Sequence, residues 1–242
     1  DGGLRRGEIT LGRRMAEYWL TPQAYFRLVL SAAASAPDAV PDLPPVVRAP
    51  AGQLRLDLVR ACAYGIETPA GKQRFGPGWS GRDEASGATL QPGKATRGGE
   101  DRSGLVLHPP YRKGTGGVWV DYYIELPAGQ ETALEFSNAI RDHVPEREPP
   151  SDGVEFKVLA AAGTGSLEEV FSRFTAAKVW EPARVDLSRF AGGMLRLRLW
   201  AGPGPAQNTT CDSGYWAEPT LLVGRQPTPT TEAQWHEREQ AA

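Results

Sequence analysis

The chain has 242 residues, of which 40% are hydrophobic, and it carries 28 glycines and 21 prolines. This is enough apolar material for the core of one large domain, and Gly and Pro at about a fifth of the residues point to many turns rather than to low complexity. The 27 basic residues are balanced by 29 acidic ones, which gives a net charge of −2. The chain therefore has no excess of positive charge that would point to nucleic-acid binding.

Residues 1–50 are predicted to form an N-terminal arm. Thr21 and Pro22 suit the cap and the first position of a helix, and an apolar stripe follows them. We expect a short amphipathic helix that packs on protein or lies on a membrane face. The prolines between 37 and 50 then favour extended chain. The side chains expected to dock are Trp19, Tyr25, Phe26 and Leu30.

Residues 51–224 are predicted to be mainly β-strand. Apolar and polar residues alternate with a period of two, which indicates strands with one buried face. The clearest segments are "QLRLDLV" with Leu54, Leu56 and Leu58 on one face, "VWVDYYIEL", "VEFKVL" and "MLRLRLW". Several short strands without interleaved helices predict a mainly β fold, an antiparallel two-sheet jelly-roll sandwich. Residues 225–242 are expected to be an extended C-terminal tail.

The segment 63–103 is rich in Gly and charged residues and is expected to be a long loop. A loop of this length is uncommon inside a domain. It is a functional loop, an inserted hairpin, or a surface that orders against a partner. Within it, Phe75 and Trp79 form either an exposed aromatic platform or a small core that pins the loop.

Residues 104–224 carry a family resemblance. The stretches "HPPYRKGTGGVWVDYYIELP", "SDGVEFKVL", "VWEPARVDLSRFAGGMLRLRLWAGPGP" and "CDSGYWAEPTLLV" are similar to bacterial extracellular jelly-roll modules, including carbohydrate-binding and discoidin-like ones. The resemblance implies a β-sandwich and an extracytoplasmic location (periplasmic, cell-surface or secreted).

The same resemblance implies a structural calcium ion, because modules of this kind often hold one. Loop carboxylates at strand ends are the oxygen donors that calcium prefers. The alternative is that each acid caps a turn or faces water. The candidate ligands are Asp152, Asp186, Asp212 and Glu218.

Cys62 and Cys211 are the two cysteines. A disulfide between them would close a very long loop and restrict the unfolded chain, and export from the cytoplasm would favour it. The alternative is a pair of buried free thiols.

Catalytic motifs are missing from the sequence. It contains no G-x-S-x-G, H-E-x-x-H or Walker pattern, and nothing selects one pair of carboxylates for glycoside hydrolysis. We therefore predict a binding protein that is not an enzyme and requires no cofactor for activity.

Aromatic side chains are the strongest candidates for binding. Trp119, Tyr123 and Trp200 fall on the outward phase of their strands, whereas Trp216 is expected to fill the core. Outward aromatics indicate a glycan platform, a surface covered by the protein's own arm, or a partner interface. The predicted ligand- or partner-binding residues are Trp79, Trp119, Tyr123, Trp200 and Tyr215.

Two functions follow from these patterns. The first is a structural or docking subunit that contacts other protein subunits, and a membrane surface peripherally, through the N-terminal arm and the segment 63–103. The second is a carbohydrate-binding module that recognises a glycan through exposed aromatics. A glycan platform would leave the outward aromatics open to solvent, whereas a docking subunit would have them covered.

Overall fold

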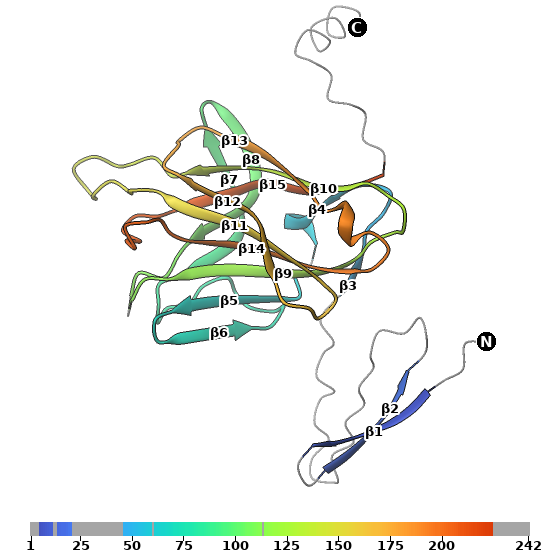
Figure 1. Cartoon of the computed structure of the whole chain (residues 1–242). Coiled ribbons are helices and arrows are strands. Elements are labelled where there is room, and N and C mark those ends of the chain that lie inside the picture. The colour runs from blue at the N-terminus through green and yellow to red at the C-terminus, as the bar shows by residue number, and fades with distance from the viewer. Residues whose placement is uncertain (1–4, 12–13, 21–45, 60, 113, 225–242) are drawn as a thin grey trace, which may run out of the picture. The chain divides into compact units, whose positions relative to one another are not determined.

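The computed structural model describes residues 5–11, 14–20, 46–59, 61–112 and 114–224. The chain divides into two units, residues 1–43 and 44–242. In the first unit, β1 (Arg5–Leu11) pairs with β2 (Arg14–Leu20) as an antiparallel hairpin (Figure 1). The hairpin includes Trp19, so this residue lies on a strand. The predicted helix and its docking residues Tyr25, Phe26 and Leu30 lie outside the described residues.

The second unit is a sandwich of two sheets, as predicted (Figure 1). The β10 sheet has the order β13 (Glu181–Asp186), β10 (Thr132–Ile140), β15 (Gly214–Val223), β8 (Glu100–His108) and β7 (Thr89–Arg97), and β4 (Gly52–Arg55) also pairs with β15. The β14 sheet has the order β12 (Glu168–Thr175), β11 (Val154–Ala162), β14 (Met194–Pro203), β9 (Gly117–Glu125), β5 (Ala63–Thr68) and β6 (Gly71–Phe75). A short β3 (Val46–Arg48) runs parallel to β9, and every other pairing in the sandwich is antiparallel.

The alternating patterns place the core between the two sheets. Trp216 is only 1% exposed, and it packs edge-to-face against Phe136 and Phe156 at 4.8 and 5.2 Å between ring centroids. This confirms its predicted role in the core. Further buried residues from the predicted strands are Val118, Val120, Tyr122, Ile124, Val158, Leu195, Leu197 and Leu199.

One residue predicted to face the core, Leu58, does not do so. The chain leaves β4 after Arg55 and forms a 3₁₀ turn over Leu56–Leu58. The turn breaks the two-residue period, so Leu56 is buried while Leu58 is 76% exposed.

The expectation of a long loop over 63–103 is also wrong. The segment contains the β5–β6 hairpin, β7 and the start of β8, so the inserted-hairpin alternative describes it best. Gly98 and Gly99 both have positive φ, 58° and 86°, in the two-residue turn between β7 and β8. Such turns match the twist of paired strands and favour glycine. The irregular part therefore shrinks to residues 76–88.

No helix in the described part of the chain is long and apolar enough to cross a membrane.

Candidate functional site

The outward face of the β14 sheet holds Trp119. Its ring lies flat on Gly65, where a Cβ atom would come within 2.0 Å of the indole. The guanidinium carbon of Arg198 lies 3.7 Å from the ring centroid on the paired strand β14. The side chain is consequently only 3% exposed, and it is covered by its own chain.

Trp200 lies beside Trp119 in the strand register and is half-buried. Its ring rests on Gly117 and Gly202, its indole N–H donates to Glu67 at 2.8 Å, and the Lys157 ammonium lies 5.5 Å from its centroid. Tyr123 packs next to these residues and is also half-buried. The three predicted aromatics thus form one group, but cations of the same chain occupy it, so an open platform is not found here.

A buried carboxylate fixes the arginine that covers Trp119. Asp121 is fully buried although it points away from the core. Arg198 donates to its two oxygens at 2.6 and 2.9 Å, and Arg196 donates at 2.8 and 3.3 Å. Charge-assisted bonds of this fork geometry hold both guanidinium groups in place.

Trp79 belongs to a small core. It stacks on Phe75 at 4.6 Å and meets Tyr64 at 5.4 Å between ring centroids. All three pack against the main core. Phe75 and Trp79 therefore form a small core that pins this segment rather than an exposed aromatic platform, and Trp79 does not lie on a binding surface.

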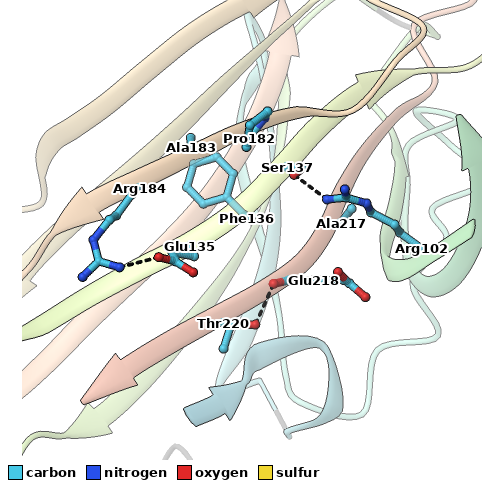
Figure 2. Close-up of a pocket in the computed structure, with 10 residues that line it drawn as sticks. All are labelled: Arg102, Glu135, Phe136, Ser137, Pro182, Ala183, Arg184, Ala217, Glu218 and Thr220. Atoms are coloured by element: carbon cyan, nitrogen blue, oxygen red, sulfur yellow. Dashed lines mark hydrogen bonds and ion pairs between the residues drawn. The ribbon is translucent and has the colours of Figure 1, made fainter. Parts of the chain in front are cut away.

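An open groove of about 520 Å³ crosses the outward face of the β10 sheet (Figure 2). It draws residues from β8, β10, β13 and β15. The lining residues are Arg102, Glu135, Phe136, Ser137, Pro182, Ala183, Arg184, Ala217, Glu218 and Thr220. A second depression of about 390 Å³ also includes Arg184, so the hollow surface continues along β10 toward Thr132.

The groove forms where β15 changes its strand partner. β8 pairs with β15 as far as Ala217, and β4 pairs with it from Thr220 onward. On the other side, Glu218 and Pro219 face the single residue Phe136, which makes a β-bulge. Glu218 has φ of 50°, a left-handed conformation that costs a residue other than glycine about 1–3 kcal/mol.

Opposite charges line the groove in equal number. Arg184 pairs with Glu135 across β13 and β10. Arg102 donates to Ser137 at 2.8 Å and to Glu100 at 2.7 Å. The Glu135, Arg184 and Glu218 side chains are 45–46% exposed, so their polar atoms can reach a ligand.

Aromatic residues adjoin the groove at Arg102. The Arg102 guanidinium carbon lies 5.7 Å from the Trp180 ring centroid, and the Trp180 and Tyr215 rings meet edge-on at 6.0 Å. Arg97 donates to the Tyr215 hydroxyl at 3.0 Å. Tyr215, a predicted binding residue, is thus buried, and the half-buried Trp180 contacts both it and Arg102. Neither ring lines the groove itself.

Of the four predicted calcium ligands, only Asp152 and Asp212 lie near each other. Asp186 accepts from the Ser188 backbone N–H at 2.9 Å, which caps a turn. Interaction with the Ser188 hydroxyl, and then with the Ser188 backbone N–H, lowers the pKa of Asp186. Glu218 lies in the groove and Asp212 lies in the 204–213 connection. Among the described residues, no three His, Cys, Asp or Glu side chains are grouped to hold a metal ion. As a set, these acids do not fit a calcium site.

Asp212 is nevertheless unusual, because it is fully buried. Ser151 donates to one of its oxygens at 2.6 Å, and the other oxygen has no hydrogen-bond partner in the described structure. Burial raises the pKa of Asp212 to about 7, with a further increase from the charge of Asp152 and an opposing effect of the Ser151 bond.

The cysteines are free thiols. Cys62 packs with Ala63 and Trp119 on the β14 sheet, whereas Cys211 lies in the connection that leads into β15 of the other sheet. The two residues lie in different parts of the sandwich, and no disulfide joins them.

The most informative residues of the groove were not predicted. Glu135 and Arg184 each lie on the outward phase of a strand, but their ion pair depends on the β10–β13 register. Trp180, which contacts Arg102 beside the groove, directly precedes β13, and an aromatic residue at a strand end is a signal that the sequence contains. Glu218 was predicted as a metal ligand and lies in the groove instead.

Comparison with known proteins gives one sequence relative and several structural ones. No protein-family model matches the chain. An uncharacterized protein of Archaeoglobus fulgidus is 33% identical over 103 residues, which are 40% of this chain and 25% of that protein. The chain thus matches about a quarter of the length of this relative.

Three solved structures are similar in fold. Tandem CBM51 modules of a family 98 glycoside hydrolase from Streptococcus pneumoniae have a TM-score of 0.43 and 12% identity over 71% of this chain and 47% of theirs. TmCBM61, solved with β-1,4-galactotriose, has a TM-score of 0.40 and 12% identity over 60% and 85%. The CBM22-1 xylan-binding domain of Paenibacillus barcinonensis Xyn10C has a TM-score of 0.38 and 10% identity over 74% and 99%. Identities this low describe fold alone.

Proposed function

We propose that this protein is a non-catalytic carbohydrate-binding module and that its glycan lies in the groove of the β10 sheet. The observation that carries the proposal is the groove itself, an open hollow of about 520 Å³ with two exposed carboxylates and two guanidinium groups on its walls. A polyhydroxylated ligand can donate to Glu135 and Glu218 and accept from Arg102 and Arg184.

The balance of charge favours a neutral glycan. Two acids and two bases line the groove, so neither an anionic nor a cationic polymer gains a net attraction there. The apolar wall of Pro182 and Ala183 offers contact for the C–H faces of a sugar ring. The continuation toward Thr132 suits an extended chain rather than a single sugar.

The same geometry argues against hydrolysis. A general acid must hold its proton near neutral pH, which usually requires burial away from positive charge. Glu135 pairs directly with Arg184, and Glu218 lies 3.7 Å from Arg55. Both carboxylates are nearly half exposed and paired with arginine, so both are placed to accept hydrogen bonds from ligand hydroxyls.

The covered aromatics do not argue for the docking-subunit interpretation, since Arg198 of the same chain covers Trp119. The remaining reason for it, the N-terminal arm, lies largely outside the described residues. An extracytoplasmic location remains part of the glycan proposal, because extended polysaccharides are mainly found outside the cytoplasm.

The test is titration calorimetry of the full chain with neutral oligosaccharides, beginning with β-1,4-linked galactose and xylose oligomers. We expect affinity to rise with chain length and to fall at least about tenfold in Glu218→Gln and Arg102→Ala. Arg48→Ala, which removes an exposed ion pair with Glu125, is the matched control and should bind normally. Binding that is unaffected by the groove variants, or no binding across a broad glycan array, would overturn the proposal.

A further inference from the structure

We propose a second binding site, for a sugar that carries a carboxylate, at the edge of the β14 sheet. A cavity of about 340 Å³ lies between the β5–β6 hairpin and the segment 83–86. Thr68, Lys72, Gln73, Ser86 and Arg112 are among the residues that line it. None of them lines the groove of the β10 sheet, so each of the two sites can be tested independently of the other.

An exposed aromatic ring lies beside Arg112, which is one of the residues that line this cavity. Tyr111 is 49% exposed, and its ring lies on Gly87, where a Cβ atom would come within 2.3 Å of it. The Tyr111 backbone N–H donates to the Ser86 carbonyl at 3.0 Å. The ring of His108 meets it edge-on at 4.9 Å. The ring is therefore fixed by its neighbours and still offers apolar surface to a sugar.

Arg112 supplies the positive charge. Its backbone N–H donates to the Ser86 carbonyl at 2.9 Å, and one guanidinium nitrogen donates to the Glu84 carbonyl at 3.0 Å. The guanidinium carbon also lies 5.3 Å from the Tyr111 ring centroid. Within the described residues, no carboxylate pairs with Arg112. The hydrogen bond to the Glu84 carbonyl orients the Arg112 guanidinium group, and its remaining N–H donors can bind an anion in bidentate geometry.

The other charged groups around the cavity have partners in the protein. Lys72 pairs with Glu67 at 2.9 Å. Asp83 accepts from the backbone N–H and the hydroxyl of Ser86 at 2.9 and 2.5 Å, inside its own turn. Among the described residues that line the cavity, Arg112 is therefore the cation without an acidic partner, and it lies beside an aromatic ring.

These features together define the ligand. The Arg112 fork matches a carboxylate, the Tyr111 ring matches the apolar face of a pyranose, and Thr68 and Gln73 can bond hydroxyls. A hexuronic acid combines all three. A neutral sugar would leave the arginine unmatched, and a simple carboxylate would leave the ring unmatched.

The experiment follows amide chemical shifts of the ¹⁵N-labelled full chain during titration with glucuronate, glucose and acetate. We expect glucuronate to shift the amides of Ser86, Tyr111 and Arg112, with glucose and acetate each at least about tenfold weaker. Arg112→Gln and Tyr111→Ala should each abolish the preference for glucuronate. Arg82→Gln, an exposed neighbour paired with Glu84, is the matched control and should retain it.

Each other outcome overturns the inference. Equal binding of acetate would show a simple anion site, and equal binding of glucose would show that the carboxylate is not recognised. Shifts confined to β10 and β15 would assign glucuronate to the groove, which separates this result from any failure of the proposed neutral-glycan site.

Discussion

Arg198 covers the indole ring of Trp119, with 3.7 Å between the guanidinium carbon and the ring centroid. The two residues lie on neighbouring strands, and the arginine is held there by the fully buried Asp121. This contact closes the surface that the sequence marks as the strongest aromatic platform. Substitutions at Arg198 and at Gly65, on which the ring lies, therefore test this arrangement.

Arg198→Ala should be strongly destabilising. The change removes one partner of a buried carboxylate and exposes the Trp119 ring, for an expected loss of about 3 kcal/mol in the free energy of unfolding. Urea denaturation followed by tryptophan fluorescence measures both the loss and the exposure. Arg48→Ala, at an exposed ion pair, should change the free energy by less than about 0.5 kcal/mol. Equal effects of the two variants would contradict the arrangement around Asp121.

Gly65→Ala should displace the Trp119 ring. The new Cβ atom would lie 2.0 Å from an indole carbon, and overpacking of this kind costs about 1–3 kcal/mol. Thermal denaturation monitored by circular dichroism gives the comparison. Gly76→Ala is the matched control, because a Cβ atom added there would meet nothing within 4 Å. An unchanged melting temperature for Gly65→Ala would mean that the ring does not lie flat on the sheet.

Glu218→Gly should separate stability from binding. Glycine tolerates the φ of 50° found at this position, so we expect the variant to gain up to about 1 kcal/mol relative to Glu218→Ala. Both variants lack the carboxylate and should bind neutral oligosaccharide equally weakly. Paired denaturation and calorimetry of the two proteins provide the measurement. A glycine variant that is less stable than the alanine variant would argue against strain at the bulge.

Asp212 should make the fold less stable as the pH rises. The pKa of its carboxyl group is about 7 in the folded protein against an ordinary value of 3.8, so the unfolded chain loses this proton first. The contribution of this carboxyl group to the free energy of unfolding is fully favourable below about pH 4. It decreases by up to about 1.4 kcal/mol per pH unit as the pH rises and is lost above about pH 7. Denaturation curves between pH 4 and 8 should show this fall. The same curves for Asp212→Asn should be flatter, and parallel curves would contradict the assignment.

The thiols should differ in reactivity. Burial raises the pKa of Cys62 to about 12, and the side chain is 3% exposed, whereas Cys211 is partly exposed. Iodoacetamide should therefore label Cys211 first in the native protein. Denatured protein without reductant should take up two labels by intact mass. Failure to label either cysteine after denaturation would instead indicate a disulfide.

Side-chain alternation in the sequence predicts the central strands β9, β11 and β14. Alternation of side chains is a local property of the extended backbone, so the runs around Val120, Phe156 and Leu197 identify both the strands and their buried faces. It failed at Leu58, because the 3₁₀ turn that ends β4 changes the period. It also failed over 63–103, where glycines that form hairpin turns resemble those of a long loop.

Strand pairing determines which outward side chains are open to a ligand. Trp119 and Arg198 are far apart in the chain, and only the β9–β14 register brings the cation over the ring. The groove likewise depends on the change of partner along β15 and on the bulge at Glu218. Contacts of this kind join residues distant in the chain, and strand pairing, which a local pattern does not specify, determines whether they form.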